Sequence, residues 1–131
     1  MDKKKCIIDK YSTVYGFDLF VILNPDKSVV DKRFEFRSDN TSILDEEWGK
    51  YVAYTVSGAY DKATDRNCVI IVMNELRGDS DDINTFAHES FHAAADVLDA
   101  CHIKFSDDTN EVFAYLIGYF TECVYKTASK K

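Results

Sequence analysis

Hydrophobic residues change their spacing about halfway along the chain. In the first half they form short runs rich in aromatic and β-branched side chains, separated by polar turns, and such runs are typical of β-strands. In the second half they recur every three or four positions, which is typical of amphipathic helices. The pattern predicts an α+β fold of about four strands followed by two helices. At 131 residues, the chain 1–131 is expected to be a single domain.

The first predicted hairpin lies between residues 14 and 37. Its first strand covers 14–23 (VYGFDLFVIL), and its second covers 28–37 (SVVDKRFEFR), in which polar and apolar residues alternate. The turn sequence NPDK joins them, and Pro25 has the backbone angle that the second position of a turn requires. A polar loop is predicted at 38–42, and ILDEEW at 43–48 is either a turn or a short helix.

A second predicted hairpin joins residues 50–60 to residues 68–74. The connection between them, DKATDRN, consists largely of residues that favour turns. The second strand, CVIIVMN, is apolar at successive positions, so both of its faces should be buried and the strand should lie inside the sheet. Two hairpins of this kind predict a sheet that is mainly antiparallel.

Two amphipathic helices are predicted in the second half of the chain. The first begins where Ser80, Asp81 and Asp82 offer N-caps and a favourable charge for a helix start. Its predicted buried stripe consists of Ile83, Phe86, Ala87, Phe91, Ala94 and Leu98. The second helix is predicted from residue 108 to residue 126. Its predicted buried stripe consists of Val112, Phe113, Leu116, Ile117, Phe120 and Val124.

The net charge of −7 argues against partners that need a basic surface, namely nucleic acids and anionic membranes. No apolar run approaches the roughly 18 residues of a membrane-spanning helix. The basic N-terminus MDKKKC could begin a signal peptide, but Asp9, Lys10 and Asp18 interrupt the apolar stretch that should follow. We therefore expect a cytoplasmic protein whose cysteines are reduced and mostly buried. These are Cys6, Cys68, Cys101 and Cys123.

The first predicted helix carries the motif H-E-x-x-H within the segment TFAHESFHAA. Residues four apart share one face of a helix, so His88 and His92 can direct their ring nitrogens at one Zn²⁺ ion. Glu89 would then lie beside the metal without binding it, placed to act as general base toward water and as general acid toward the leaving group. The alternative is an ordinary amphipathic helix with two surface or core histidines, but the ordered motif favours a metal site.

A hydrolytic zinc site needs a third protein ligand. His102 follows His92 by ten residues, which does not fit the pattern H-E-x-x-H-x-x-G-x-x-H, and Ala95 stands at the position of its glycine. Glu111 is the better candidate, because 18 residues separate it from His92 and it opens the second predicted helix. It could instead form a capping box with Asp108, in which its carboxylate would bind the backbone at the helix start.

Further polar residues follow on the same helix. Asp96 and Asp99 lie four and seven residues beyond His92 on one face. Either carboxylate could hold the second nitrogen of a ligand histidine, or both could be solvated charges. Cys101 and Cys123 could be soft metal ligands, although buried thiols are the expectation for both.

Together these residues resemble a known group of enzymes. HESFH, a gap of 18 residues and then NEVFA at 110–114 resemble the gluzincin metallopeptidases, and within them the aminopeptidase-N-like pattern H-E-x-x-H-x18-E. The resemblance implies a zincin-like fold, Zn²⁺ as cofactor and Glu89 as the catalytic residue. It also implies a peptide or protein substrate, bound extended along a sheet edge beside the active helix, for which Cys68–Met73 is the candidate strand. The implied zinc ligands are His88, His92 and Glu111.

The resemblance covers the last third of the chain, and small single-domain gluzincins and bacterial or phage-encoded H-E-x-x-H proteins are similar overall. The 131 residues contain no G-A-M-E-N segment, which aminopeptidases use to hold a free amino terminus, so an endopeptidase is expected. Spacing does not select a transition-state residue among Tyr115, Tyr119 and Tyr125. The expected function is hydrolysis of peptide bonds. The alternative is a catalytically inactive zincin-like binding or regulatory protein that has kept or lost the metal.

Overall fold

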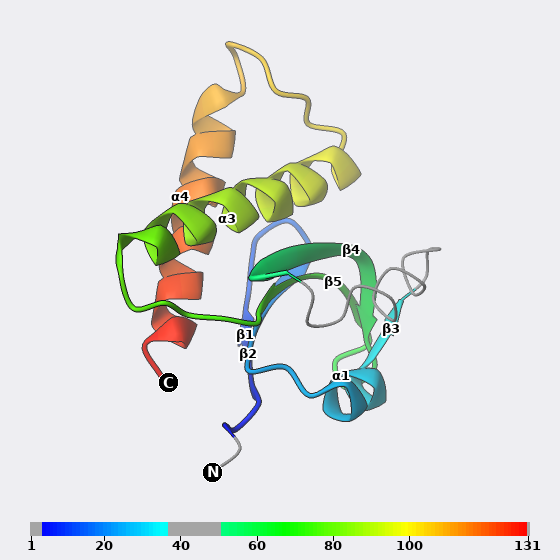
Figure 1. Ribbon diagram of the computed structural model, residues 1–131. Coiled ribbons are helices and arrows are strands. Elements are labelled where there is room, and N and C mark those ends of the chain that lie inside the picture. The colour runs from blue at the N-terminus through cyan, green and yellow to red at the C-terminus, as the bar shows by residue number, and fades with distance from the viewer. Residues whose placement is uncertain (1–3, 37–50, 131) are drawn as a thin grey trace.

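The computed structural model describes residues 4–36 and 51–130, which form one mixed sheet with helices packed on it. Figure 1 shows how these elements follow one another. In chain order they are β1 (Ile7–Tyr11), β2 (Asp18–Leu23), α1 (Lys27–Arg33), β3 (Phe34–Phe36), β4 (Ala53–Asp61), β5 (Arg66–Met73), α3 (Ser80–Ala100) and α4 (Asn110–Ala128). The predicted loop at 38–42 and the segment at 43–48 lie outside the described residues.

The sheet has five strands in the order β1-β2-β5-β4-β3. β2 and β5 run parallel, whereas the other neighbouring pairs are antiparallel. The predicted α+β class is confirmed, but the prediction of a mainly antiparallel sheet missed one strand and the parallel pair. The hairpin expected from 50–60 and 68–74 is confirmed as β4 and β5. β5 lies between two other strands, as its apolar residues on both faces predicted.

The prediction of a strand at 28–37 that pairs with β2 is wrong. This stretch instead forms α1 and then β3, which pairs with β4 at the opposite edge of the sheet. The Asp26 side chain accepts a hydrogen bond of 3.1 Å from the backbone N–H of Ser28 and so caps the helix. Val30 is buried on the inner side of α1. The cap and this contact outweigh the strand-like alternation of the sequence.

β1 is the strand that the sequence did not predict. It pairs with β2 in an antiparallel hairpin at one edge of the sheet. The strand expected at 14–23 is shortened to β2, because the connecting turn contains Gly16 with a φ of 80°. Asp9, whose charge argued against an apolar segment, accepts a hydrogen bond of 2.8 Å from the Thr127 hydroxyl. This charge therefore links β1 to the end of α4.

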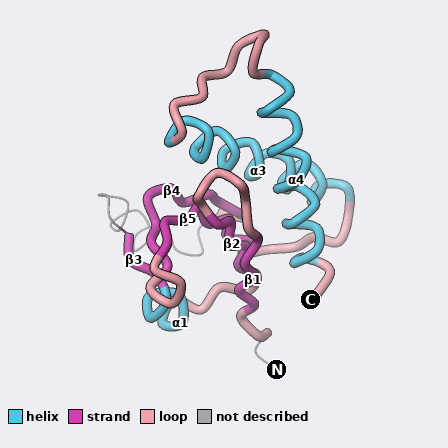
Figure 2. Tube along the Cα trace, turned by 180° about the vertical axis from the view of Figure 1, so that it is seen from behind, coloured by secondary structure: helices cyan, strands magenta, loops and turns pink. Residues whose placement is uncertain are grey.

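Both faces of the central strands are buried, because side chains alternate along β2 and β5. The face with Leu19, Val21, Val69 and Ile71 packs against α3 and α4. The opposite face, with Phe20, Ile22, Ile70 and Val72, packs with Val30 of α1 and Phe34 of β3. Figures 1 and 2 show the two long helices crossing on one side of the sheet, with α1 away from them next to β3.

The two predicted helices are confirmed as α3 and α4. α3 begins after Asp79, which caps it one residue before the predicted positions. Its buried face is rotated from the predicted one, because Phe86, Ala94 and Leu98 are buried whereas Ile83, Ala87 and Phe91 are exposed. Glu89 and Ser90 lie on the buried side instead. The H-E-x-x-H motif therefore straddles the border between the buried and the exposed face.

α4 buries the face that its sequence predicted. Phe113, Leu116, Phe120 and Val124 are buried, while Val112 and Ile117 are half-buried. None of the helices described here combines the length and the hydrophobicity that crossing a membrane would require. Of the four unpaired cysteines, expected to be mostly buried, Cys68 and Cys123 are buried, whereas Cys6 and Cys101 are half-buried.

Candidate metal centre

The outer face of α3 carries both histidines of the motif. His88 and His92 are exposed, and their rings meet edge to face with centroids 4.8 Å apart. Their Nε2 atoms lie 3.2 Å apart and so converge on one point. Two ligands of a tetrahedral zinc ion, each at roughly 2.0 to 2.1 Å, would lie about 3.3 Å apart. The same separation also permits a hydrogen bond between the rings, with one as donor and the other as acceptor.

Glu89 directs its carboxylate toward the sheet. One residue along a helix corresponds to a rotation of about 100°, so Glu89 leaves the face of His88 and reaches the buried side. Its side chain is buried, with an Oε2 atom 3.9 Å from Nε2 of His88. Its Oε1 atom accepts a hydrogen bond of 2.8 Å from the hydroxyl of Thr55 on β4. The carboxylate is thus held between the histidine pair and β4.

Thr55 is a contributor to the site that the sequence did not reveal. Its hydroxyl also lies 3.1 Å from the backbone carbonyl oxygen of Glu89, so one hydrogen is shared between two acceptors. Threonine is common in strands, and nothing in its neighbours distinguishes this one. The contact exists only because β4 packs beside α3 in the folded chain. A sequence pattern could not have found it.

The structure does not bring Glu111 to the histidines. Glu111 lies exposed in the first turn of α4. Within residues 4–36 and 51–130, no three side chains of the His, Cys, Asp and Glu types are grouped so that they could hold one metal ion. The folded chain therefore places the Glu89 carboxylate beside His88, while Glu111 is not grouped with the two histidines.

The residues that end α3 and begin α4 have backbone roles. The capping box of Asp108 and Glu111 is not formed, because Thr109 is the N-cap residue of α4. The Thr109 hydroxyl instead donates a hydrogen bond to the backbone carbonyl of Lys104 in the preceding loop. His102 has a φ of 61° directly after α3, in the left-handed conformation that commonly ends a helix. The backbone conformation that ends α3 therefore accounts for the place of His102.

Asp96 and Asp99 continue the histidine face of α3 toward its C-terminus. Asp96 is half-buried and Asp99 is exposed. Burial raises the pKa of the Asp96 carboxyl, His92 partly offsets that effect, and Asp99 reinforces it. Neither carboxylate accepts a hydrogen bond from a histidine ring in the part of the chain that the structure describes. Of the two alternatives for these carboxylates, support of a ligand nitrogen is thus not formed there.

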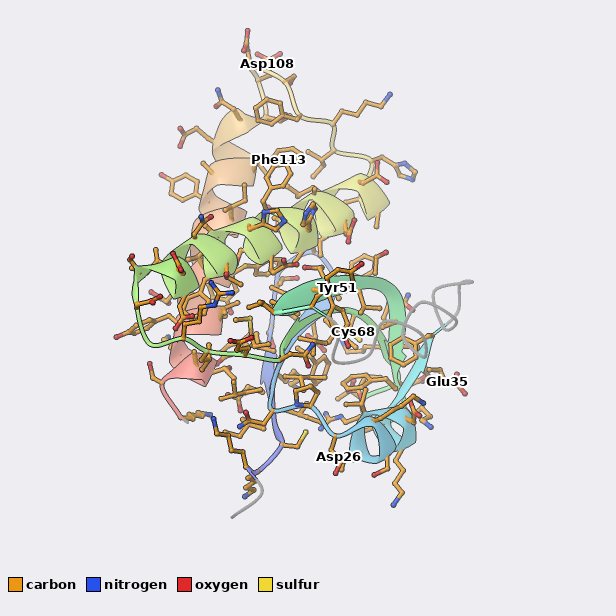
Figure 3. The ribbon with its side chains drawn as sticks, in the orientation of Figure 1. Asp26, Glu35, Tyr51, Cys68, Asp108 and Phe113 are labelled. Carbon is orange, nitrogen blue, oxygen red and sulfur yellow. The ribbon has the colours of Figure 1, made fainter. Side chains whose placement is uncertain are left out.

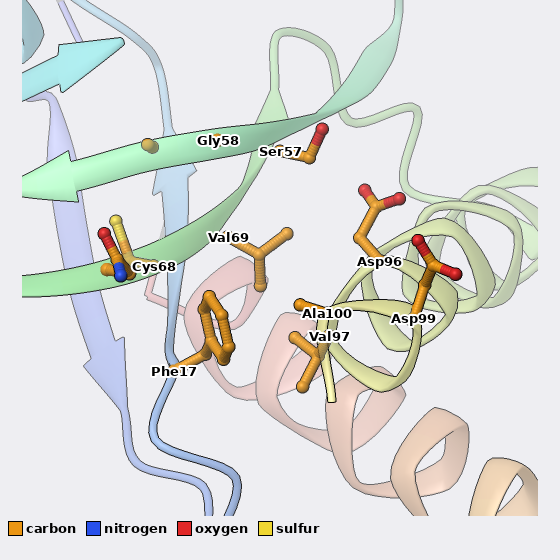
Figure 4. A pocket seen from close by; sticks show the side chains of 11 residues that line it. Phe17, Ser57, Gly58, Cys68, Val69, Asp96, Val97, Asp99 and Ala100 are labelled. Carbon is orange, nitrogen blue, oxygen red and sulfur yellow. The ribbon is translucent and has the colours of Figure 1, made fainter. Parts of the chain in front are cut away.

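A cavity of about 350 Å³ lies between these two aspartates and the sheet. Figure 4 shows Asp96 and Asp99 on one of its walls and Ser57 of β4 across from them. Phe17 and Val69 give it an apolar side. The surface is therefore hollowed beyond the motif, between the C-terminal part of α3 and the sheet.

The strand expected to pair with substrate is not available for pairing. Cys68–Met73 belong to β5, which is hydrogen-bonded to β2 on one side and to β4 on the other. Among the described residues, β4 pairs with β3 only over Ala59–Asp61. Closer to its start, β4 carries Thr55, whose hydroxyl touches Glu89. The strand beside the motif is thus β4 rather than β5.

Comparisons with known proteins provide no assignment. No family model matches the chain, and no curated protein or solved structure is significantly similar to it. The function has to be inferred from the side chains that α3 and β4 place together. These are an imidazole pair with converging nitrogens and a buried carboxylate fixed by a hydroxyl.

Proposed function

We propose that this chain is a zinc-dependent metallopeptidase of zincin-like fold that hydrolyses internal peptide bonds. The observation that supports this most is the pair of Nε2 atoms 3.2 Å apart, with the Glu89 carboxylate 3.9 Å from one of them. Imidazole nitrogens are favoured zinc ligands, and His88 and His92 fit two positions of a tetrahedral site. A bound zinc ion supplies a Lewis acid that polarises a carbonyl and activates water.

Glu111 is the proposed third ligand. Its support is the spacing of 18 residues after His92, the NEVFA context and an exposed position in the first turn of α4. To complete the site it would have to approach the two histidines. Metal binding commonly orders its own ligands, because the free energy of coordination offsets the cost of arranging them.

Glu89 is the proposed general base and acid. It takes a proton from the water that attacks the scissile carbonyl, and a C–O bond forms. It then delivers that proton to the leaving amine as the C–N bond breaks, so the products are a carboxylic acid and an amine. The Thr55 hydroxyl donates a hydrogen bond to one oxygen of the Glu89 carboxylate. The other oxygen, which faces His88, is the one proposed to take and deliver the proton.

Thr55 is expected to position Glu89. Thr55→Val should lower kcat for peptide hydrolysis about tenfold, because the carboxylate loses the hydrogen bond that fixes its orientation. Thr55→Ser keeps the hydroxyl and should remain within about twofold of the wild type. Steady-state kinetics on one peptide, with zinc content measured in parallel, checks both variants. An equal loss in the two variants would contradict a positioning role carried by the hydroxyl alone.

The substrate is proposed to bind as an extended chain beside β4, at the edge near Thr55. Backbone N–H and C=O groups of a strand edge give affinity to an added strand without requiring a particular sequence. This edge is favoured over others because Thr55 links it directly to Glu89. A peptide bond presented there would lie near the carboxylate that moves the proton.

A zinc-binding protein without catalytic activity is the second candidate. It is favoured by the absence of a third ligand beside His88 and His92 among the described residues. Such a protein would use the same histidine pair and the same edge of β4 to hold a partner rather than to cleave it.

Removal of the metal tests the proposal. Protein stripped with a chelator and the same protein reconstituted with zinc are each incubated with a mixed peptide library, and cleavage products are identified by mass spectrometry. We expect internal cleavage with zinc and none without it. Zinc binding with no cleavage of any peptide would favour the second candidate. Cleavage that persists in the chelator-treated protein would contradict a metallopeptidase.

A further inference from the structure

An aromatic groove continues the histidine face of α3 toward its C-terminus. The residues at 88, 91, 92, 95, 96 and 99 are spaced by three or four and therefore share one side of the helix. Beyond His92 this side forms one wall of a cavity of about 700 Å³. The loop after α3 and the first turn of α4 form the other wall. The groove is thus contiguous with the candidate metal centre.

Three phenylalanine rings line the groove. Phe91 is 52% exposed, and its ring lies 5.9 Å from the ring of His92. Phe105 is 69% exposed and packs edge to face on Phe113 at 5.2 Å. Figure 3 shows Phe113 where α4 passes α3. Large aromatic side chains gathered at a hollow surface commonly mark a binding site, because they keep apolar area in contact with water.

Two carboxylates stand among these rings. Asp96 and Asp99 line the same groove, and His92, one turn before Asp96, is the basic side chain that acts on the Asp96 carboxylate. Lys104 also lines the groove, but it makes no ion pair with either carboxylate there. Asp96 is half-buried, so keeping its carboxylate charged is costly, and a ligand with a positive charge would relieve that cost.

We propose that this groove binds an arginine or lysine side chain of the peptide substrate, next to the scissile bond. The aliphatic stem would lie on the rings of Phe91 and Phe105, and the cation would pair with Asp96 and Asp99. A cation over an aromatic face adds further attraction. Charge complementarity selects this occupant, because a purely apolar side chain would bury the carboxylates without a partner and an acidic one would be repelled. The inference rests on the proposed function, which places the reacting centre on α3.

Binding of small probes tests the groove without catalysis. The zinc-loaded full chain is titrated with acetyl-arginine amide and with acetyl-citrulline amide, its neutral isostere, and ring signals of Phe91 and Phe105 are followed by NMR. We expect the arginine compound to bind about tenfold more tightly and to shift both rings. The double variant Asp96→Asn/Asp99→Asn should bind the two compounds equally. Equal binding by the wild type would overturn the proposal.

A control variant and a cleavage assay complete the test. Asp107→Asn/Asp108→Asn makes the same change in charge at exposed residues outside the groove and should keep the preference for arginine. Paired peptides that differ only in arginine or citrulline beside the cleaved bond should differ about tenfold in kcat/KM. Cleavage with no such preference would overturn this inference and leave the metallopeptidase standing. Arginine-selective binding without any cleavage would support the groove and contradict the proposed enzyme.

Discussion

Replacing Glu89 by glutamine should lower kcat for peptide hydrolysis by about 10²- to 10⁴-fold while zinc remains bound. The amide keeps the size of the side chain, and its oxygen can still accept the hydrogen bond from the Thr55 hydroxyl. It cannot take a proton from water, so the step assigned to Glu89 is lost. Steady-state kinetics on a peptide from the library, with elemental analysis of the same sample, measures both quantities.

Glu122 provides a matched control for this substitution. It is exposed on α4, where its carboxylate lies 3.3 Å from the ammonium group of Lys126. Glu122→Gln should leave kcat within about twofold of the wild type, because a surface ion pair contributes little. Zinc-loaded Glu89→Gln protein that retained wild-type turnover would contradict the assigned mechanism.

Asp61→Asn should lower the free energy of unfolding by about 2 to 4 kcal/mol at pH 7. Asp61 is fully buried at the end of β4 and accepts a hydrogen bond of 3.0 Å from the Arg33 guanidinium. The Thr64 hydroxyl and the Ala63 backbone N–H also donate to it. Asparagine would keep some of these bonds but would leave Arg33 without its charged partner. Urea unfolding followed by circular dichroism measures the loss.

The pH dependence of this loss has a defined direction. Burial alone would raise the pKa of Asp61, but the donors led by Arg33 together hold the pKa below its usual value. The stabilisation is therefore complete above the unfolded-state pKa of about 3.9, and it is lost as the pH falls through the folded-state pKa. Wild type and Asp61→Asn should thus differ most near neutral pH and converge in acid.

Asp31 serves as the comparison for Asp61. It is exposed and pairs with Lys27 one turn away at 2.8 Å. Asp31→Asn should change the free energy of unfolding by less than about 0.5 kcal/mol at any pH. Equal stability of Asp61→Asn and the wild type at pH 7 would contradict the structural role of the buried carboxylate.

Periodicity was sufficient to predict the elements whose burial follows one pattern throughout. α4 keeps its stripe from Phe113 to Val124, and β5 is apolar on both faces because both are covered. It failed where one particular contact decides the structure. α1 depends on the cap from Asp26 to Ser28, and β1 contains a charge that is satisfied by Thr127, far away in the sequence. The cap lies within the sequence pattern and was outweighed there by the strand-like alternation, whereas the partner of Asp9 is visible only in three dimensions.

The candidate site likewise contains some residues that the sequence predicts and others that only the folded structure reveals. His88, Glu89 and His92 could be found from the sequence, because helical geometry alone sets their relative positions. Thr55 could not be found, since it reaches Glu89 through the packing of β4 on α3. The exposed Phe91 could not be predicted either, because its spacing fits a buried stripe and only the docking of α3 on the sheet decides which side is covered.

The zinc content of the purified chain is the most direct test of the proposed site. The protein is prepared without added metal or a metal-binding tag and analysed for zinc, alongside His88→Ala and Glu111→Ala variants. We predict about one zinc per wild-type chain, none in His88→Ala and a reduced amount in Glu111→Ala. A wild-type chain that holds no zinc, even after reconstitution, would contradict the account and leave α3 as an amphipathic helix with two surface histidines.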